Sequence, residues 1–228
     1  YELLESTAPL GITEEDIDCP IGTLGLPELG TRFVQQVLVE AKPRTFADLL
    51  QVSGLTHGTD VWLGNAQDLI RDGICTISEV VGTRDGIMLD LIRYGLDNGN
   101  SFTIMEEVRK GKGLKPEWEE DMRAHNVPEW YIDSCKKIKY MFPKAHASAY
   151  VIAAIRLGWY KVYRPLEYYA AYFSVRADNF SYGKMCQGKE SLETLMTQMI
   201  ARADILSKKD QDVLKDMRSV QEMYARGF

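Results

Sequence analysis

The sequence predicts a mainly α-helical fold with a short irregular or β segment at its start. Three observations support this prediction. From Thr31 onward apolar residues recur every three or four positions, prolines stand where several helices would begin, and residues 1–30 are rich in Gly and Pro. The 228 residues are 45% hydrophobic, which is enough to bury a core in one large domain or two small ones.

Residues 1–30 have little core of their own and are expected to form turns and short strands packed against the rest. Within them, the acidic run that follows Thr13 is typical of a capped helical turn. Asp16 and Asp18 in this run could instead be a carboxylate pair that holds metal ions, since Mg²⁺ sites need converging carboxylates.

Helices follow along the rest of the chain. Apolar spacing predicts the first two around Phe33 to Leu38 and after Pro43. Proline fits the start of three later helices, and Thr76 and Ser78 can cap another. The further helices are expected at about 60–71, 76–81, 84–95, 100–110, 116–125, 128–140, 144–163, 165–176, 189–205 and 207–226. The last two predict a helical hairpin whose methionine-rich stripe is core and not a binding surface.

Charge and cysteine content exclude several classes of protein. The net charge of −6 argues against a general nucleic-acid coat, so any contact with a polyanion must be local. The four cysteines lie more than forty residues apart without a CxxC pair, which indicates neither a zinc site nor a disulfide framework.

The N-terminal sequence and the most apolar expected helix indicate where the protein is located. The chain lacks a starting Met and a signal-peptide pattern, so we expect it to be cut from a longer protein. The apolar helix at 147–162 is interrupted by Ser148, Arg156 and Lys161, which is atypical of a membrane span. We expect a cytoplasmic protein.

The stretch from Tyr140 to Tyr150 contains the strongest indication of chemistry. Pro143 suits a first helical position, and a helix beginning there would place unpaired N–H groups beside Lys144 and His146. That arrangement is typical of a phosphate site. The alternative is an ordinary helix start with an exposed lysine and histidine.

Two basic islands accompany this stretch. One is Lys136, Lys137, Lys139 and Lys144, and the other runs from Val108 to Lys115 and includes Arg109, Lys110 and Lys112. Gly111 and Gly113 would let the second island approach a ligand closely, or they would simply end a helix in a solvated loop.

Further candidates lie in polar turns. The turn at 53–65 offers His57 and Asp60 to a cleft, although its polar groups would also suit helix capping. Arg84, near a helix start, could donate hydrogen bonds to phosphate oxygens, or it could form a surface ion pair with Asp85. Aromatic residues at 168–173 could stack on bases, but their helical spacing also suits core.

Taken in order, several segments resemble a single family, the PolC-type replicative DNA polymerases, which are C-family polymerase III alpha subunits. The resemblance extends from about Ser6 to Phe228 and is looser at 97–100 and over the final fifty residues. One departure is Thr56, where the family usually has Ser. The matching segments are Gly22-Thr-Leu-Gly-Leu-Pro-Glu-Leu-Gly-Thr-Arg-Phe33, residues 53–67, Val108-Arg-Lys-Gly-Lys-Gly113, residues 127–140 and the stretch from Tyr140 to Tyr150.

The resemblance implies a division of the chain and an activity. Residues 1–30 would end the palm, 31–180 would form the core of helical fingers, and 181–228 would be a hairpin leading to an absent DNA-binding region. The full-length protein would be a DNA-directed DNA polymerase whose fingers close over the incoming dNTP and the templating base. Palm aspartates upstream would hold two Mg²⁺ ions, so the chain alone would be inactive and contain no catalytic or metal-binding residue.

The resemblance also implies partners and roles. Primer-template DNA and dNTP would bind here, whereas the sliding clamp, other replisome subunits and the exonuclease would involve regions outside this chain, and no membrane is expected. Lys144, His146 and Arg84 would contact the triphosphate, Phe142, His57 and Asp60 would shape the nucleotide pocket, and Arg109, Lys110 and Lys112 would contact triphosphate or DNA. A non-enzymatic helical module that binds DNA and a purely structural helical domain are the alternatives.

Overall fold

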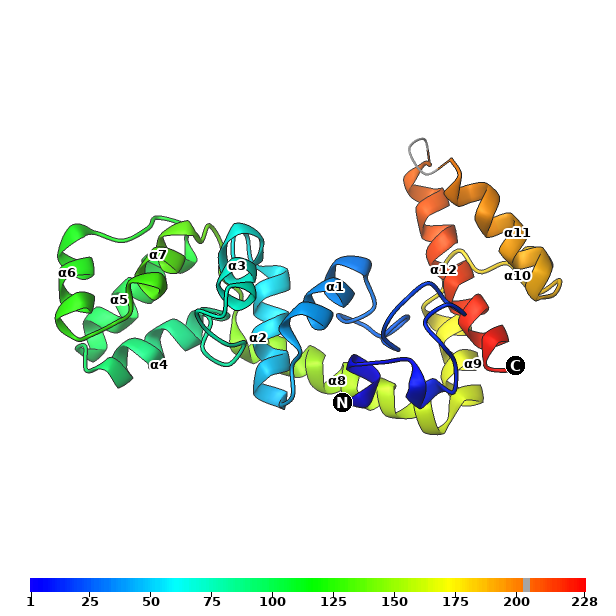
Figure 1. Cartoon of the computed structure of the whole chain (residues 1–228), viewed down its shortest axis with the longest axis horizontal. Helices are drawn as coiled ribbons and strands as arrows, with labels where there is room; N and C mark the ends of the chain where they lie inside the picture. The colour runs from blue at the N-terminus through cyan, green and yellow to red at the C-terminus, as the bar shows by residue number, and fades with distance from the viewer. Residues whose placement is uncertain (203–205) are drawn as a thin grey trace. The chain divides into compact units, whose positions relative to one another are not determined.

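The computed structural model describes residues 1–202 and 206–228 and is mainly helical, as predicted (Figure 1). None of these described residues belongs to a β-strand, and one isolated antiparallel bridge joins Thr59 to Tyr140. The α-helices are α1 (Arg32–Ala41), α2 (Phe46–His57), α3 (Gln67–Arg71), α4 (Arg84–Tyr94), α5 (Asn98–Arg109), α6 (Pro116–Ala124), α7 (Glu129–Lys137), α8 (Lys144–Tyr163), α9 (Pro165–Val175), α10 (Tyr182–Met185), α11 (Lys189–Ile200) and α12 (Lys208–Ala225).

The chain divides into two compact units. The terminal unit consists of Tyr1–Thr31 and Ala154–Phe228, and the central unit is Arg32–Ala153. Helix α8 contributes its first half to the central unit and its second half to the terminal unit.

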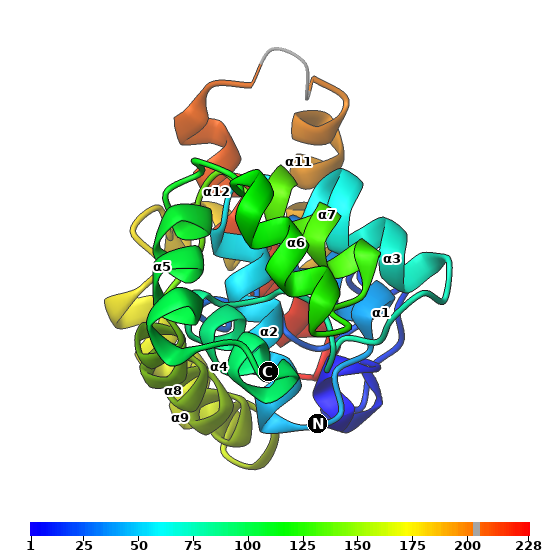
Figure 2. The ribbon, with the colours of Figure 1, turned by 90° about the vertical axis from the view of Figure 1, so that its left-hand side faces the viewer.

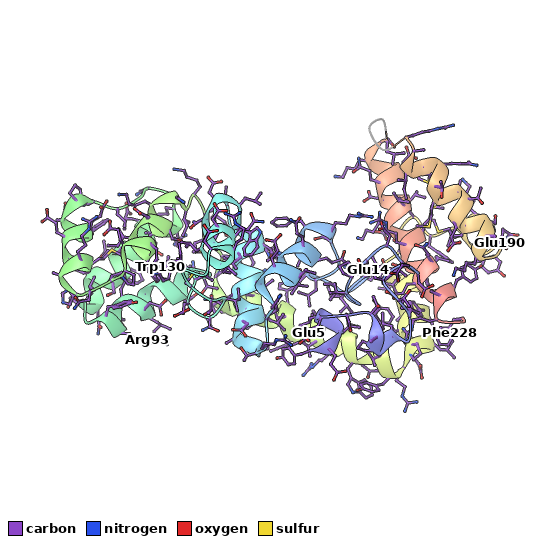
Figure 3. The ribbon with its side chains drawn as sticks, viewed as in Figure 1. Glu5, Glu14, Arg93, Trp130, Glu190 and Phe228 are labelled. Carbon is purple, nitrogen blue, oxygen red and sulfur yellow. The ribbon has the colours of Figure 1, made fainter. Side chains whose placement is uncertain are left out.

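In the central unit, α1 packs on α2, α4 on α5, and α6 on α7. Figure 1 shows α4 to α7 as one group in green, and Trp130 and Arg93 are labelled on it in Figure 3. Helix α5, for example, buries Ile104 and Val108 on one face. Local signals define the ends: the Thr45 side chain caps α2 in a reciprocal box with Asp48.

The terminal unit begins with an irregular segment that contains two short 3₁₀ helices, η1 (Glu2–Leu4) and η2 (Ala8–Leu10). Helices α11 and α12 form the predicted hairpin, drawn in orange and red in Figure 1, with Glu190 labelled on α11 in Figure 3. The expected methionine core is confirmed, because Met185, Met196 and Met217 are buried together with Leu192 and Val220. Residues 203–205, at the end of the helix expected at 189–205, lie outside the described residues.

A buried ion pair fastens the irregular segment to the helices of the terminal unit. Lys161 of α8 is fully buried, and its Nζ donates to the carbonyl oxygens of Gly22 (2.8 Å) and Leu24 (2.5 Å) and to Glu222 Oε2 (2.9 Å). The Tyr169 hydroxyl donates to the other carboxylate oxygen at 2.6 Å. The network therefore joins α8, α9, α12 and the backbone of residues 22–24.

Three predicted helices differ from the structure. Residues 76–81 form turns, because Gln51 Nε2 donates to the Val80 carbonyl and Gly82, just beyond this segment, lies against Gly54. The helix expected at 60–71 is interrupted by non-helical backbone at 63–65, within the irregular π-helical turn η3 (Trp62–Ala66). The helix expected to reach residue 140 ends at Lys137, since Ile138 is extended and the next residues pair with Thr59.

Candidate functional site

Lys139–Phe142, here called the hub segment, is the point where the predicted site residues of the central unit meet. Its backbone exchanges hydrogen bonds with three other segments: Thr59 N donates to Tyr140 O (2.9 Å), Arg84 N to Phe142 O (3.2 Å) and Met141 N to Arg109 O (3.3 Å). The segments after α2, at the start of α4 and at the end of α5 therefore converge on the residues that lead into α8.

Four rings form a chain of contacts beside the hub segment. The ring centroids of His57 and Phe142 are 4.9 Å apart and stacked, those of Phe142 and His146 are 5.1 Å apart, and those of His146 and Tyr150 are 4.6 Å apart. All but half-buried Phe142 are exposed. The chain offers aromatic edges and faces to a planar ligand.

The His57 ring is also oriented by its own helix. Its Nδ1 lies 2.8 Å from the carbonyl oxygen of Ser53, so the neutral ring is assigned a proton on Nδ1, which leaves Nε2 as the acceptor. Asp60 has a left-handed backbone with a φ of 56°, and its carbonyl accepts from the Asn65 side chain at 3.0 Å. The structure places Asp60 next to the bridge residue Thr59, but shows no contact between its exposed carboxylate and the four rings.

The start of α8 differs from the expectation of unpaired N–H groups. The Lys144 N–H donates to Asp85 Oδ2 at 2.7 Å, so a carboxylate from α4 already caps this helix. The Arg84 guanidinium lies 3.9 Å from the same oxygen. An incoming anion would therefore meet side-chain cations here, and not the first backbone N–H of the helix.

The Lys144 ammonium is exposed and forms no ion pair within the described part of the chain. Its charge still reaches Asp90 on α4. Burial raises the pKa of Asp90, against the lowering effects of the Tyr131 hydrogen bond and of the Arg93 and Lys144 charges. Lys144, half-buried Arg84 and the exposed Lys139 of the hub segment itself are thus cations of the hub region that are open to a ligand.

Arg109, Lys110 and Lys112 are already engaged with acidic side chains. Arg109 Nη2 donates to Glu106 Oε2 (2.9 Å), Lys110 lies 3.1 Å from the same oxygen, and Lys112 lies 3.2 Å from a Glu107 oxygen. Hydrogen bonds from Arg109 and then Lys110 lower the pKa of Glu106 to about 2. The second basic island is therefore largely neutralised, and its backbone contacts the hub segment at Arg109 and Gly111.

The residues present do not fit a metal ion. Within residues 1–202 and 206–228, no group of three or more His, Cys, Asp or Glu side chains is arranged to hold one. Asp16 Oδ2 instead accepts from the backbone N–H of Thr13 (2.9 Å) and its hydroxyl (3.2 Å), which confirms the capped turn. Among the described residues, no helix has the length and apolarity needed to cross a bilayer.

Two residues of this site escaped prediction from sequence. The Asp85 carboxylate caps the helix at Lys144, which lies 59 residues later in the sequence, so no local pattern could reveal this contact. Tyr150 extends the ring chain, and its spacing of four from His146 was a usable signal, because residues four apart share one helix face.

Comparison with known proteins places this chain in a family. A model of the bacterial DNA polymerase III alpha subunit finger domain matches residues 3–127. The chain belongs to this family. This finger-domain chain is 55% identical over 227 residues to DNA polymerase III PolC-type of Bacillus subtilis (strain 168), and 56% identical over 219 residues to that of Pediococcus pentosaceus.

These alignments cover nearly all of this finger-domain chain and a small part of each relative. They span 100% and 96% of the chain, but only 16% and 15% of the B. subtilis and P. pentosaceus proteins. The resemblance to PolC-type polymerases is thereby confirmed.

Proposed function

We propose that this chain is the nucleotide-binding finger region of a PolC-type replicative DNA polymerase, and that it holds the incoming dNTP while residues outside the chain perform phosphoryl transfer. The observation that supports this most is the convergence on the hub segment. Of the six predicted dNTP residues, Phe142 belongs to it, and the rings of His57 and His146 contact the Phe142 ring. Lys144 lies two residues beyond it, and the backbone N–H of Arg84 donates to the Phe142 carbonyl.

The proposed division of labour follows from the chemistry of the side chains. Lys144 and Arg84 would neutralise triphosphate oxygens, because ammonium and guanidinium groups form strong charge-assisted hydrogen bonds to phosphate. The ring chain would contact the base and sugar. Mg²⁺ would be held by carboxylates elsewhere in the longer protein, and primer-template DNA, the clamp and other replisome subunits would be further partners.

The non-enzymatic DNA-binding alternative has less support. Its affinity would depend on the basic islands, yet Arg109, Lys110 and Lys112 are paired with Glu106 and Glu107. Ion-paired cations release fewer counterions from DNA phosphates when they bind, so they contribute less to affinity.

Removal of the Lys144 ammonium tests the proposal. In the full-length polymerase, Lys144→Ala should lower kcat/KM for single-nucleotide incorporation by about tenfold or more, which corresponds to ~1.4 kcal/mol for one charge-assisted contact. Lys136→Ala is the control, since it removes a lysine of the same basic island that lies outside the hub segment and is ion-paired with Glu119, and it should stay within about threefold of the parent.

The same two variants also distinguish this proposal from the DNA-binding alternative. If Lys144→Ala left incorporation unchanged, the triphosphate assignment would be wrong. If both variants weakened primer-template binding equally and with the same salt dependence, the basic island would be a general DNA contact.

A further inference from the structure

The first turns of α4 and α8 meet in the central unit, and both helices are labelled in Figure 2. Each start donates one hydrogen bond to the other side. The Arg84 N–H donates to the Phe142 carbonyl at 3.2 Å, and the Lys144 N–H donates to the Asp85 carboxylate at 2.7 Å. These two bonds fix the Asp85 carboxylate beside the cations to which the proposed function assigns the triphosphate.

The Asp85 carboxylate is not the cap of its own helix. Thr83 fills that position, because its hydroxyl oxygen accepts from the Gly86 N–H at 3.2 Å. Asp85 instead extends across to α8 and stays accessible to solvent, since its side chain is 41% exposed and that of Arg84 is 37% exposed. A ligand that reaches Arg84 can therefore also approach Asp85.

The other acid whose charge is felt near Lys144 is Asp90, and its oxygens have partners of their own. Its Oδ2 accepts from the Tyr131 hydroxyl at 3.1 Å, and its Oδ1 accepts from Arg93 at 3.0 Å. Asp90 thus takes part in the packing of α4 on α7, whereas Asp85 stands at the helix start beside the two cations.

The distances around Asp85 leave the Arg84 side chain free to bind an anion. Arg84 Nε lies 3.9 Å from Asp85 Oδ2, which is too long for a hydrogen bond. The guanidinium therefore keeps its donors for phosphate oxygens. A triphosphate held by Arg84 and Lys144 would lie close to the Asp85 carboxylate, and the like charges would repel each other.

We propose that Asp85 sets the affinity of the nucleotide site, because its negative charge opposes the binding of any triphosphate to Arg84 and Lys144. The attraction of these cations for a triphosphate is the same whichever base the nucleotide carries. A carboxylate that offsets part of this attraction lets nucleotides that do not pair with the template leave the site sooner. The inference rests on the proposed triphosphate roles of Arg84 and Lys144.

Asp85→Asn in the full-length polymerase tests the inference, because asparagine keeps an oxygen acceptor for the Lys144 N–H but has no charge. In single-turnover incorporation, the Kd of the correct dNTP should fall at least about threefold while the maximum rate changes little, as expected for a change in uniform binding. Inhibition by inorganic tripolyphosphate, which has neither base nor sugar, should strengthen by a similar factor. Both gains should shrink at higher salt, since ions screen the repulsion.

Asp97→Asn is the matched control. Asp97 also caps a helix of the central unit, by accepting from the Asn100 N–H at 3.0 Å, but it does so at the start of α5, whereas the end of α5 contacts the hub segment. This variant should change neither the dNTP Kd nor the inhibition by tripolyphosphate. Asp85→Ser repeats the test with a second neutral acceptor and should shift both values in the same direction as Asp85→Asn.

A dNTP Kd that is unchanged or raised in both Asp85 variants would overturn the inference, because the carboxylate would then act only as a helix cap. Equal gains in Asp85→Asn and Asp97→Asn would also overturn it, since a general loss of negative charge would explain them. Lys144→Ala separates this result from the proposed function. If Lys144→Ala lowers kcat/KM and Asp85→Asn leaves Kd unchanged, only the role of Asp85 is wrong; if Lys144→Ala has no effect, the triphosphate assignment itself fails.

Discussion

At the scale of single residues, Lys161 is an ionisable side chain that is fully buried. Desolvation lowers the pKa of this buried lysine, and the charge of Glu222 acts in the opposite direction. Each partner therefore depends on the other: a buried charge that loses its counter-charge is far more costly than one that keeps it. Arg226 adds to the same region, because its Nη1 donates to the Lys161 carbonyl at 2.8 Å, and the ring of the last residue, Phe228, labelled in Figure 3, lies 6.3 Å from that of Tyr169.

Lys161→Met should destabilise the terminal unit by about 3–5 kcal/mol, because it leaves the Glu222 carboxylate and two carbonyls buried without their donor. The double variant Lys161→Met/Glu222→Met should cost clearly less than the sum of the two single variants, since it removes both charges. Urea unfolding of the four proteins measures this coupling. Additive losses would show that the pair does not act as a unit.

The sequence indicated which side chains belong to the candidate site better than it indicated whether those side chains are already paired. The run around Lys144 and His146 was visible because a proline and two basic residues share one helix start. Whether each cation is open to a ligand depends on distant or neighbouring acids: Asp85 reaches the start of α8 from α4, and Glu106 and Glu107 neutralise the second basic island. Such pairings involve side-chain rotamers that the sequence pattern does not specify.

At the scale of elements, the hub segment explains why a predicted helix stops early. Residues 138–140 continue a helical pattern, but Lys139 N and Tyr140 N both approach the Thr59 carbonyl, and this pairing requires extended backbone. Hydrogen bonds between segments that are distant in sequence outweigh intrinsic helix propensity here, because that propensity differs little from one ordinary residue to another. The same competition turns 76–81 away from helix, whereas α8 and α9 were correctly predicted because a proline stands at the start of each of them.

Gly111 tests how closely the hub segment is packed. Gly111 and Gly113 have φ of 72° and 75°, so alanine is strained at either position, but only at Gly111 would a Cβ lie 2.4 Å from the Lys139 carbonyl oxygen. Nothing lies within 4 Å of the corresponding position at Gly113. We expect Gly113→Ala to cost about 1–2 kcal/mol from strain alone and Gly111→Ala to cost at least about 1 kcal/mol more.

Thermal or urea unfolding of the two glycine variants supplies the comparison. An equal loss of unfolding free energy in the two variants would mean that the loop after α5 moves away from the hub segment without cost. The hydrogen bond from Met141 N–H to the Arg109 carbonyl would then not hold the loop in place.

At the scale of the whole molecule, the two units differ in what they contain. The central unit has every predicted contact to the nucleotide and to DNA, while the terminal unit contains the buried ion pair, the methionine core and an apolar cleft. The sequence predicted the helical class and the hairpin, since both depend on local periodicity. It did not predict the cleft, which is formed by residues 25 and 27 together with residues 157–176, far apart along the chain.

The central claim is that the incoming nucleotide lies against the ring chain that begins at the hub segment. Photo-crosslinking tests it most directly: the full-length polymerase, bound to primer-template DNA, is irradiated with 8-azido-dATP opposite a templating thymine, and tryptic peptides are mapped. We predict that the label falls in peptides 140–144 or 145–156, and that excess unmodified dATP prevents it. Labelling confined to peptides outside the central unit, with 140–156 unmodified, would contradict the claim.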